Sequence, residues 1–164
     1  MATEEKYIYD YPRPMLTADC MVVNDRNEVL LVRRGNDPYK GCWALPGGFM
    51  EMDETLEHCA VRELEEETGL KVDEQDIRLI GVYSAPDRDP RGRTVTAAYA
   101  VVSRKWESAP RRGTEHLGKE KKCSEEIGKP VAGDDAAEVR WWPLNALPKL
   151  AFDHAQIVSD GQRL

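Results

Sequence analysis

The chain has no apolar run long enough to cross a bilayer, which takes about 18 consecutive residues. Its first residues are acidic and rich in tyrosine, with no apolar core behind a basic stretch, so we expect no signal peptide. Cysteine is scarce and irregularly spaced, without a C-x-x-C pair, and occurs at Cys20, Cys42, Cys59 and Cys123. This pattern argues against a disulfide framework or a zinc site and favours reduced thiols in a cytoplasmic protein.

The chain also lacks an internal repeat and a second-domain boundary, so we expect one domain over residues 1–164. Hydrophobic residues make up 41% and charged residues 32%, as in a soluble globular protein. Residues 104–133 differ from the rest, because they are polar, contain glycine and proline, and hold no clean period. We expect an exposed loop insertion there.

The formal net charge of −7 comes from one short stretch. Residues 51–67 hold eight carboxylates and one arginine, which sum to −7 and leave the rest of the chain neutral. Water, protonation or bound cations must relieve such a concentration of carboxylates. The acidity is therefore local, and it indicates a cation site more than a general repulsion of anionic partners.

Short apolar runs separated by turn residues predict several strands. Residues 16–23 and 28–34 flank a polar turn and are expected to pair as a hairpin. Residues 94–102 are rich in strand-forming residues, and residues 139–142 predict another strand that a proline ends.

Two helices are expected. The clearer one covers residues 54–68 and is ended by Gly69, a typical C-terminal cap. The second begins at Asp153, because Asp153 and Gln156 form a capping-box pattern. We expect His154 on this helix to have a structural role.

The first helix carries three glutamates on one face. At about 3.6 residues per turn, Glu63, Glu66 and Glu67 lie within about 100° of one another, whereas Glu65 points to nearly the opposite side. Three carboxylates on one patch repel one another unless a divalent cation lies between them, and such hard oxygen ligands suit Mg²⁺ or Mn²⁺. The alternative is a water-facing acidic helix, which is the usual meaning of a glutamate run.

The residues around the glutamates favour the metal site. The run Leu45-Pro46-Gly47-Gly48 predicts a tight turn whose bare backbone can approach a metal. Arg62 lies beside the patch, where bidentate pairing can fix carboxylate rotamers. Gly48 is followed after five residues by Glu54 and after seven more by Arg62. At ordinary residue frequencies, a chance match to the complete pattern has a probability below about one in a million.

Residues 48–70, GFMEMDETLEHCAVRELEEETGL, resemble the signature G-x5-E-x7-R-E-U-x-E-E-x-G-U (U aliphatic) of the Nudix hydrolases at every position. The resemblance implies an α/β fold, the Nudix α/β/α sandwich with a mixed sheet flanked by helices. It also implies that water attacks phosphorus in a nucleoside diphosphate linked to another group X. The implied metal ligands are the carbonyl of Gly47 with Glu63, Glu66 and Glu67. The implied supporting residues are Gly48, Glu54 and Arg62, with Arg62, Glu63 and Glu66 in the catalytic centre.

The general base remains open. In several branches of the family it is an acidic residue in a loop outside the motif. Asp135 is our candidate, with Asp134 and Glu138 beside it and Glu125 and Glu126 as weaker alternatives. Each of these residues has the alternative of being a solvated loop carboxylate.

Residues 81–93 bear on the substrate. They resemble the ADP-ribose pyrophosphatase branch, in which a proline lies a little over a dozen residues past the motif, and Pro86 lies sixteen residues after Leu70. The run Arg-Asp-Pro-Arg-Gly-Arg and the later Phe152-Asp153-His154 resemble Nudix domains associated with NAD metabolism. Arginines can bind phosphate and ribose groups, although an ordinary charged turn is the alternative. The substrate-binding candidates are Arg33, Arg34, Pro86, Arg88, Arg91 and Arg93.

The leading function implied by the resemblance is hydrolysis of ADP-ribose, or a close ADP-sugar, to AMP and ribose 5-phosphate with Mg²⁺ or Mn²⁺. One alternative is a pyrophosphohydrolase of modified nucleoside triphosphates. Another is a ligand sensor, as in regulators that fuse such a domain to a DNA-binding winged helix. The chain ends about twenty residues after Pro143, so we expect no such module. The expected partner is a small nucleotide, with neither nucleic acid nor membrane bound, and the family resemblance adds the expectation of a homodimer.

Overall fold

The computed structural model describes residues 9–102 and 136–164. The loop insertion expected at residues 104–133 lies outside the described residues and stays a prediction, as does the single domain over 1–164. No helix in the described part of the chain is both long and apolar enough to span a membrane.

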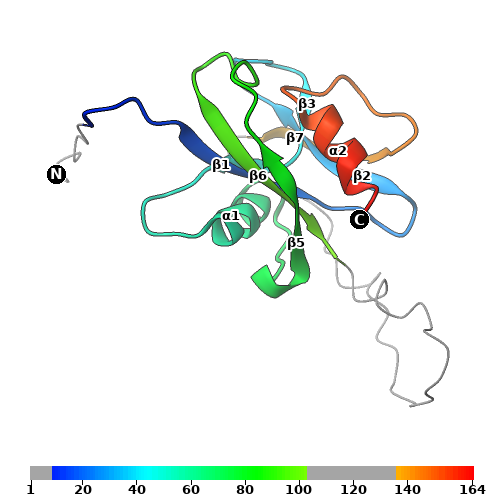
Figure 1. The fold of residues 1–164 in the computed structure, drawn as a ribbon. Coiled ribbons are helices and arrows are strands. Elements are labelled where there is room, and N and C mark those ends of the chain that lie inside the picture. The colour runs from blue at the N-terminus through cyan, green and yellow to red at the C-terminus, as the bar shows by residue number, and fades with distance from the viewer. Residues whose placement is uncertain (1–8, 103–135) are drawn as a thin grey trace.

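Seven strands and three helical segments make up the described fold (Figure 1). In chain order they are β1 (Met15–Met21), β2 (Glu28–Arg34), β3 (Trp43–Ala44), β4 (Gly47–Phe49), α1 (Leu56–Thr68), the 3₁₀ turn η1 (Glu74–Asp76), β5 (Ile77–Tyr83), β6 (Thr94–Val101), β7 (Ala136–Pro143) and α2 (His154–Gly161). One sheet has the order β4-β1-β6-β5, and a smaller one has the order β3-β2-β7.

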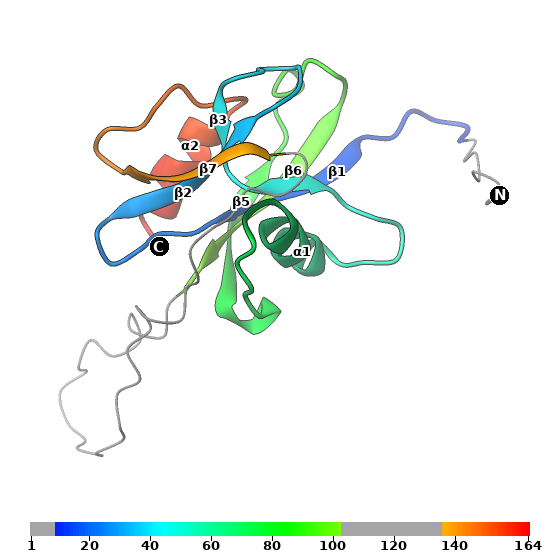
Figure 2. The same cartoon turned by 180° about the vertical axis from the view of Figure 1, so that it is seen from behind.

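The larger sheet is mixed, because β1 runs parallel to β6 while its other pairings are antiparallel. Successive residues of β1 point to opposite faces of this sheet. Cys20 belongs to the apolar cluster with α1, whereas Met21 belongs to the cluster with Ile157 and Val158 of α2. The two helices therefore cover different faces (Figures 1 and 2). The predicted mixed sheet flanked by helices is confirmed.

The two strands predicted to pair as a hairpin, residues 16–23 and 28–34, form but pair only next to the turn, so the predicted hairpin is wrong over the rest of its length. Only the ends adjacent to the turn pair, through a bridge between Val23 and Val29 and the bond from the Leu30 N–H to the Val22 carbonyl. β1 is a central strand that is hydrogen-bonded to β4 on one edge and to β6 on the other. β2 pairs instead with β3 and β7 in the second sheet.

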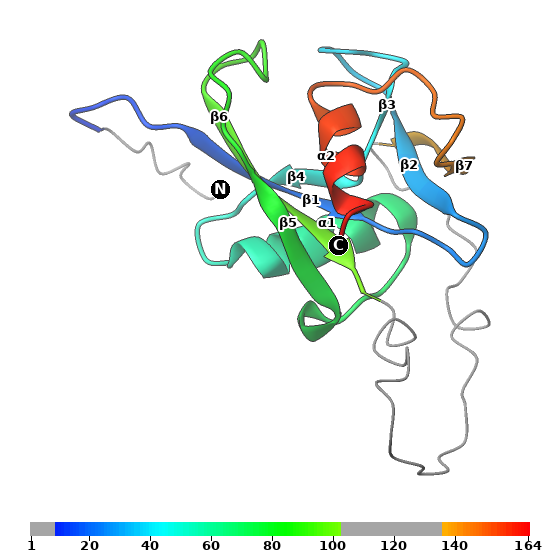
Figure 3. The same cartoon turned by 45° about the vertical axis from the view of Figure 1, so that its right-hand side comes forward.

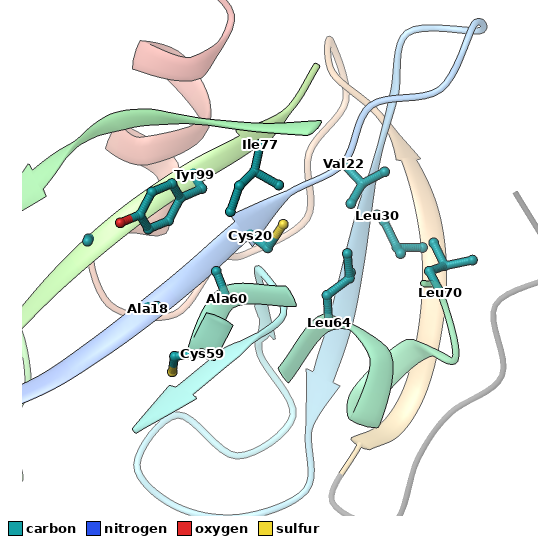
Figure 4. Packing of buried hydrophobic residues seen from close by; sticks show 11 residues of the cluster. Ala18, Cys20, Val22, Leu30, Cys59, Ala60, Leu64, Leu70, Ile77 and Tyr99 are labelled. Atoms are coloured by element: carbon teal, nitrogen blue, oxygen red, sulfur yellow. The ribbon is translucent and has the colours of Figure 1, made fainter. Parts of the chain in front are cut away.

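Helix α1 forms where the sequence predicts it, two residues late. The Thr55 hydroxyl accepts the N–H of His58 and caps its start, and Gly69 ends it with φ 73°. Its buried residues, among them Ala60 and Leu64, pack against the β1 residues Ala18 and Cys20 (Figure 4). This packing fixes which face of α1 is turned away from water.

Helix α2 begins at the predicted place, but the capping box is wrong. Asp153 is the N-cap residue and makes no capping hydrogen bond with its side chain. Its carboxylate instead accepts two hydrogen bonds from the guanidinium of Arg88, at 2.9 and 2.7 Å. The start of α2 is thereby connected to the loop between β5 and β6.

Candidate active site

A cleft of about 530 Å³ lies where the two sheets diverge. The loop between β2 and β3, the loop between β5 and β6, and the start of α2 lie together at this end of the molecule (Figure 3). Asp19, Glu63 and Glu67 line the cleft and are called its acidic side. Arg34 and Arg91, with Phe152, also line it and are called its basic side.

Glu67 is the most buried glutamate of the acidic side. Its Oε2 accepts the N–H of Gly47 at 3.1 Å. Burial raises the pKa of Glu67 to about 8, and the nearby charges of Glu63 and Asp19 raise it further against the Gly47 hydrogen bond. Burial also raises the pKa of Glu63, despite its ion pair with Arg62. The acidic side therefore holds negative charge at a cost in free energy.

Arg62 connects three carboxylates and a backbone carbonyl around the acidic side. The bidentate pairing expected with the glutamate patch is made with Glu54 instead, from Nε at 3.0 Å and from Nη2 at 2.7 Å. Its Nη1 donates to Glu63 at 2.8 Å and to Glu66 at 3.1 Å, and its Nη2 donates to the carbonyl of Phe49 at 3.2 Å. The hydrogen bond from Arg62 is the main cause that lowers the pKa of Glu54 to about 2.

Glu66 lies apart from the cleft. Its side chain is 58% exposed and lines a hollow on the outer surface of α1. Glu65 lies outside the cleft, lines the same hollow as Glu66 and pairs with Lys71 at 2.7 Å. Glu66 therefore does not share the face of Glu63 and Glu67, contrary to the prediction. Within the described residues, no three carboxylate, histidine or cysteine side chains converge as a ready metal-binding group. The ion pairs with Arg62 partly explain this absence, because the guanidinium of Arg62 binds Glu63 and Glu66 in the place of a metal ion.

The turn predicted over residues 45–48 is shorter than expected, because the chain bends at Pro46 and both glycines already lie in β4. Gly47 pairs with Asp19, and Gly48 pairs with Ala18, in the ladder between β4 and β1. A Cβ on Gly48 would collide with the carboxylate of Glu63, and one on Gly47 would collide with Asp19 and the Ala18 carbonyl. Glycine is required because the carboxylates approach the backbone so closely.

Asp19 is a cleft residue that the sequence analysis did not identify. It is 6% exposed, and its Oδ2 accepts the hydroxyl of Thr96 at 2.6 Å. The Nε2 of His154 lies 3.6 Å from its Oδ1, while the Nδ1 of His154 accepts the N–H of Leu45 at 2.9 Å. An aspartate inside the otherwise apolar strand β1 was the available signal, because a buried carboxylate needs partners.

The basic side combines guanidinium groups with aromatic rings. Arg34 lies over the ring of Phe152 at 4.9 Å, and its Nε donates to the Pro38 carbonyl at 2.7 Å. Arg91 lies 5.0 Å from the ring of Phe49 and 5.6 Å from that of Phe152. Burial first, and then the charge of Arg91, lower the pKa of Arg34 from its usual value. The two arginines are thus close enough to repel each other.

The other predicted substrate residues differ in their placement. Arg33 lines the cleft and lies 3.6 Å from Glu138, and Arg88 lines it with a guanidinium already paired with Asp153. Pro86 and Arg93 do not line it, and the Nη1 of Arg93 donates to the Ser84 carbonyl at 2.7 Å. Contact of these residues with a substrate stays a prediction.

The general-base candidates remain untested. Asp135 and Asp134 lie outside the described residues, as do Glu125 and Glu126. Glu138 lies on β7, opposite Arg33 of β2, and does not line the cleft.

Comparisons with known proteins extend the similarity well beyond residues 48–70. A family profile described as NUDIX domain matches residues 13–160. An ADP-ribose pyrophosphatase of Methanocaldococcus jannaschii is 42% identical over 153 residues, which cover 93% of this chain and 76% of that protein. A bifunctional NMN adenylyltransferase/ADP ribose pyrophosphatase of Francisella tularensis, solved with AMP and a Mn ion, is 29% identical with a TM-score of 0.71, covering 94% of this chain and 43% of that one. The NUDIX domain of Shewanella oneidensis NrtR, solved with ADP ribose, is 28% identical with a TM-score of 0.68, covering 94% and 92%.

Proposed function

The chain belongs to the NUDIX family, and on that premise we propose that it hydrolyses ADP-ribose at the diphosphate, giving AMP and ribose 5-phosphate. The observation that carries the proposal is a single cleft with buried carboxylates on one side and guanidinium groups on the other. The name of the M. jannaschii relative supports ADP-ribose as the substrate, as do the AMP and ADP-ribose in the two solved neighbours.

The acidic side fits a hard divalent cation, for which Mg²⁺ is our proposal and Mn²⁺ the alternative. Its donors are carboxylate oxygens and the backbone of Gly47. Burial first, and then neighbouring carboxylates, raise the pKa values of Glu63 and Glu67, and a bound cation would offset this cost of holding them charged. Magnesium commonly binds through one or two carboxylates, completed by water and substrate phosphates. A complete set of protein ligands is therefore not required. The residues that would hold the metal are Gly47, Glu63 and Glu67, and Glu66 would join them only by leaving its ion pair with Arg62.

The bound metal would supply Lewis-acid polarisation of the phosphoryl oxygens and stabilise the departing phosphate. The residues of the chain have separate tasks. The pair of Glu54 and Arg62 orients Glu63, and Arg34 and Arg91 bind the diphosphate oxygens by charge-assisted hydrogen bonds. Asp135 remains our candidate for the base that takes the proton of the attacking water. The free thiols of Cys20 and Cys59 fit our proposal of a reducing, cytoplasmic location.

A panel of nucleoside diphosphate compounds and nucleoside triphosphates, each assayed with Mg²⁺ and again with a chelator, tests the proposal. ADP-ribose should give the highest kcat/KM, and chelation should abolish turnover. If a triphosphate ranks first and inorganic pyrophosphate is released, the enzyme belongs to a different substrate class and ADP-ribose is the wrong assignment.

A ligand sensor is a second candidate, because the NrtR domain binds ADP-ribose and matches 94% of this chain. The intact set of motif glutamates favours the enzyme instead. Tight binding of ADP-ribose without metal-dependent hydrolysis of any diphosphate would favour the sensor.

A further inference from the structure

Phe152 adopts a backbone conformation that phenylalanine rarely accepts. Its φ is 51°, in the left-handed region that costs a residue with a Cβ about 1–2 kcal/mol. The chain is anchored on both sides of Phe152, because the N–H of buried Ala151 donates to the Trp43 carbonyl at 2.8 Å and buried His154 accepts the N–H of Leu45. The chain between these two anchors therefore projects a large ring from a strained position.

The ring of Phe152 lies among the cationic groups of the basic side. The Cζ atoms of Arg34 and Arg91 lie 4.9 and 5.6 Å from its centroid. The ring of Tyr39 meets it edge-on at 4.9 Å. An aromatic face attracts a guanidinium through its quadrupole, so one ring offsets part of the repulsion between two like charges.

Both arginines keep donor groups for a ligand. The Nε of Arg34 is bonded to the Pro38 carbonyl, whereas its Nη1 and Nη2 have no hydrogen-bond partner within residues 9–102 and 136–164. Asp89 binds the Nε and Nη2 of Arg91, and Nη1 has no partner within the same residues. These donors belong to side chains that line the same cleft as Glu63 and Glu67.

We propose that Phe152 is a positioning residue that holds Arg34 and Arg91 against its ring, so that both guanidinium groups bind the diphosphate of the substrate. This inference rests on the proposed function for the presence of a diphosphate, and it does not depend on the identity of the attached sugar. If Phe152 only fills space, any apolar side chain of similar size replaces it.

Matched variants separate these roles. Phe152→Leu keeps apolar volume and removes the aromatic face, and Phe152→Tyr keeps the face. Phe152→Gly removes the side chain and accepts the positive φ, which provides a ringless variant without backbone strain. Phe49→Leu serves for comparison, because Phe49 contacts only Arg91 of the two arginines.

Steady-state kinetics should use the nucleoside diphosphate compound that the wild type hydrolyses fastest. We expect KM to rise about tenfold in Phe152→Leu and Phe152→Gly, and about threefold in Phe49→Leu, with kcat within about twofold of wild type. Phe152→Tyr should keep KM within about twofold of wild type. Melting temperatures of all variants show whether the ringless ones are folded.

An unchanged KM in folded Phe152→Leu or Phe152→Gly would overturn the positioning role, and so would equal KM values for Phe152→Leu and Phe152→Tyr. A failure of the proposed function looks different, because the wild type itself then prefers another substrate or hydrolyses none. If the wild type hydrolyses no substrate, calorimetric titration with ADP-ribose gives dissociation constants in place of KM. The dissociation constants of the variants should then follow the order expected for KM. An equal affinity of wild type and Phe152→Leu overturns the inference.

Discussion

The acidic and basic sides of the cleft differ in how their like charges are balanced. On the acidic side, Arg62 is the positive partner of several carboxylates, and burial raises the pKa values of Glu63 and Glu67. On the basic side, Arg91 has its own carboxylate in Asp89 and shares the ring of Phe152 with Arg34. The acidic side therefore needs a bound cation to balance its carboxylates. The basic side already has most of its charge balanced by Asp89 and the aromatic rings, and its remaining donors are available to an anionic ligand.

The largest effect is expected from Glu67→Gln, which removes a buried carboxyl group, our proposed metal ligand, from the acidic side. We expect kcat to fall about a thousandfold, or about 4 kcal/mol in the barrier, because metal-ion catalysis supplies several kcal/mol. The control is Glu65→Gln, whose carboxylate lies on the other side of α1 and pairs with Lys71. Glu65→Gln should keep wild-type kcat. A Glu67→Gln variant within tenfold of wild type would show that the acidic side is not the catalytic one.

The second effect is a loss of stability from breaking the ion pair of Arg88 with Asp153, which joins the β5–β6 loop to the start of α2. Asp153→Asn leaves the guanidinium of Arg88, which is 4% exposed, without its charge partner. We expect a loss of about 3 kcal/mol in the free energy of unfolding, or about 8 °C in melting temperature. Thermal denaturation measures it. The double variant Arg88→Met with Asp153→Leu should recover part of the loss, and a single variant as stable as wild type would contradict a structural role for the pair.

The two sides also differ in how far the sequence predicts them. Glu63 and Glu67 of the acidic side belong to residues 48–70, whose spacing fixes a helix face, so their shared face could be predicted, whereas the pairing of Arg62 with Glu54 could not. The basic side joins Arg34, residues 88–91 and residues 152–154, which meet only through the fold. No local period records that meeting. The resemblance of residues 152–154 pointed to Phe152, but its contact with Arg34 and Arg91 could not be predicted.

The fold shows the same division. Helix α1 and the long strands follow from local periodicity and caps, which are readable over a few residues. The pairing of β1 with β6, the short strands β3 and β4, and the bulged strand β5 depend on partners distant in the chain. The capping box at Asp153 failed because Arg88, 65 residues earlier, binds the same carboxylate.

A third comparison decides which arginines of the β5–β6 loop bind the substrate. Arg91→Ala removes a cleft guanidinium and should raise KM about thirtyfold, or about 2 kcal/mol, with little change in kcat. Arg93→Ala should raise KM less than threefold, because its side chain bonds to the Ser84 carbonyl outside the cleft. Equal effects of the two substitutions in steady-state kinetics would show that the loop rearranges around the substrate.

The smallest expected effect is a pH-dependent loss of stability from the ion pair of Glu54 with Arg62, next to the acidic side. The hydrogen bond from Arg62 lowers the pKa of Glu54 from 4.5 to about 2, so its stabilisation is complete above 4.5 and is lost as the pH falls toward 2. Glu54→Gln should cost about 1 kcal/mol in the free energy of unfolding at pH 7. The difference from wild type, measured by denaturant unfolding, should shrink between pH 4.5 and 2. A difference that grows on acidification would contradict the assigned pairing.

The most direct test is phosphorus NMR of ADP-ribose incubated with the purified chain and Mg²⁺, with Glu67→Gln in parallel. The predicted result is conversion of the diphosphate signals into those of AMP and ribose 5-phosphate in equal amounts, with no conversion by the variant. Persistence of the diphosphate signals with the wild type, or equal conversion by Glu67→Gln, would contradict the assignment of this cleft as a metal-dependent ADP-ribose hydrolase.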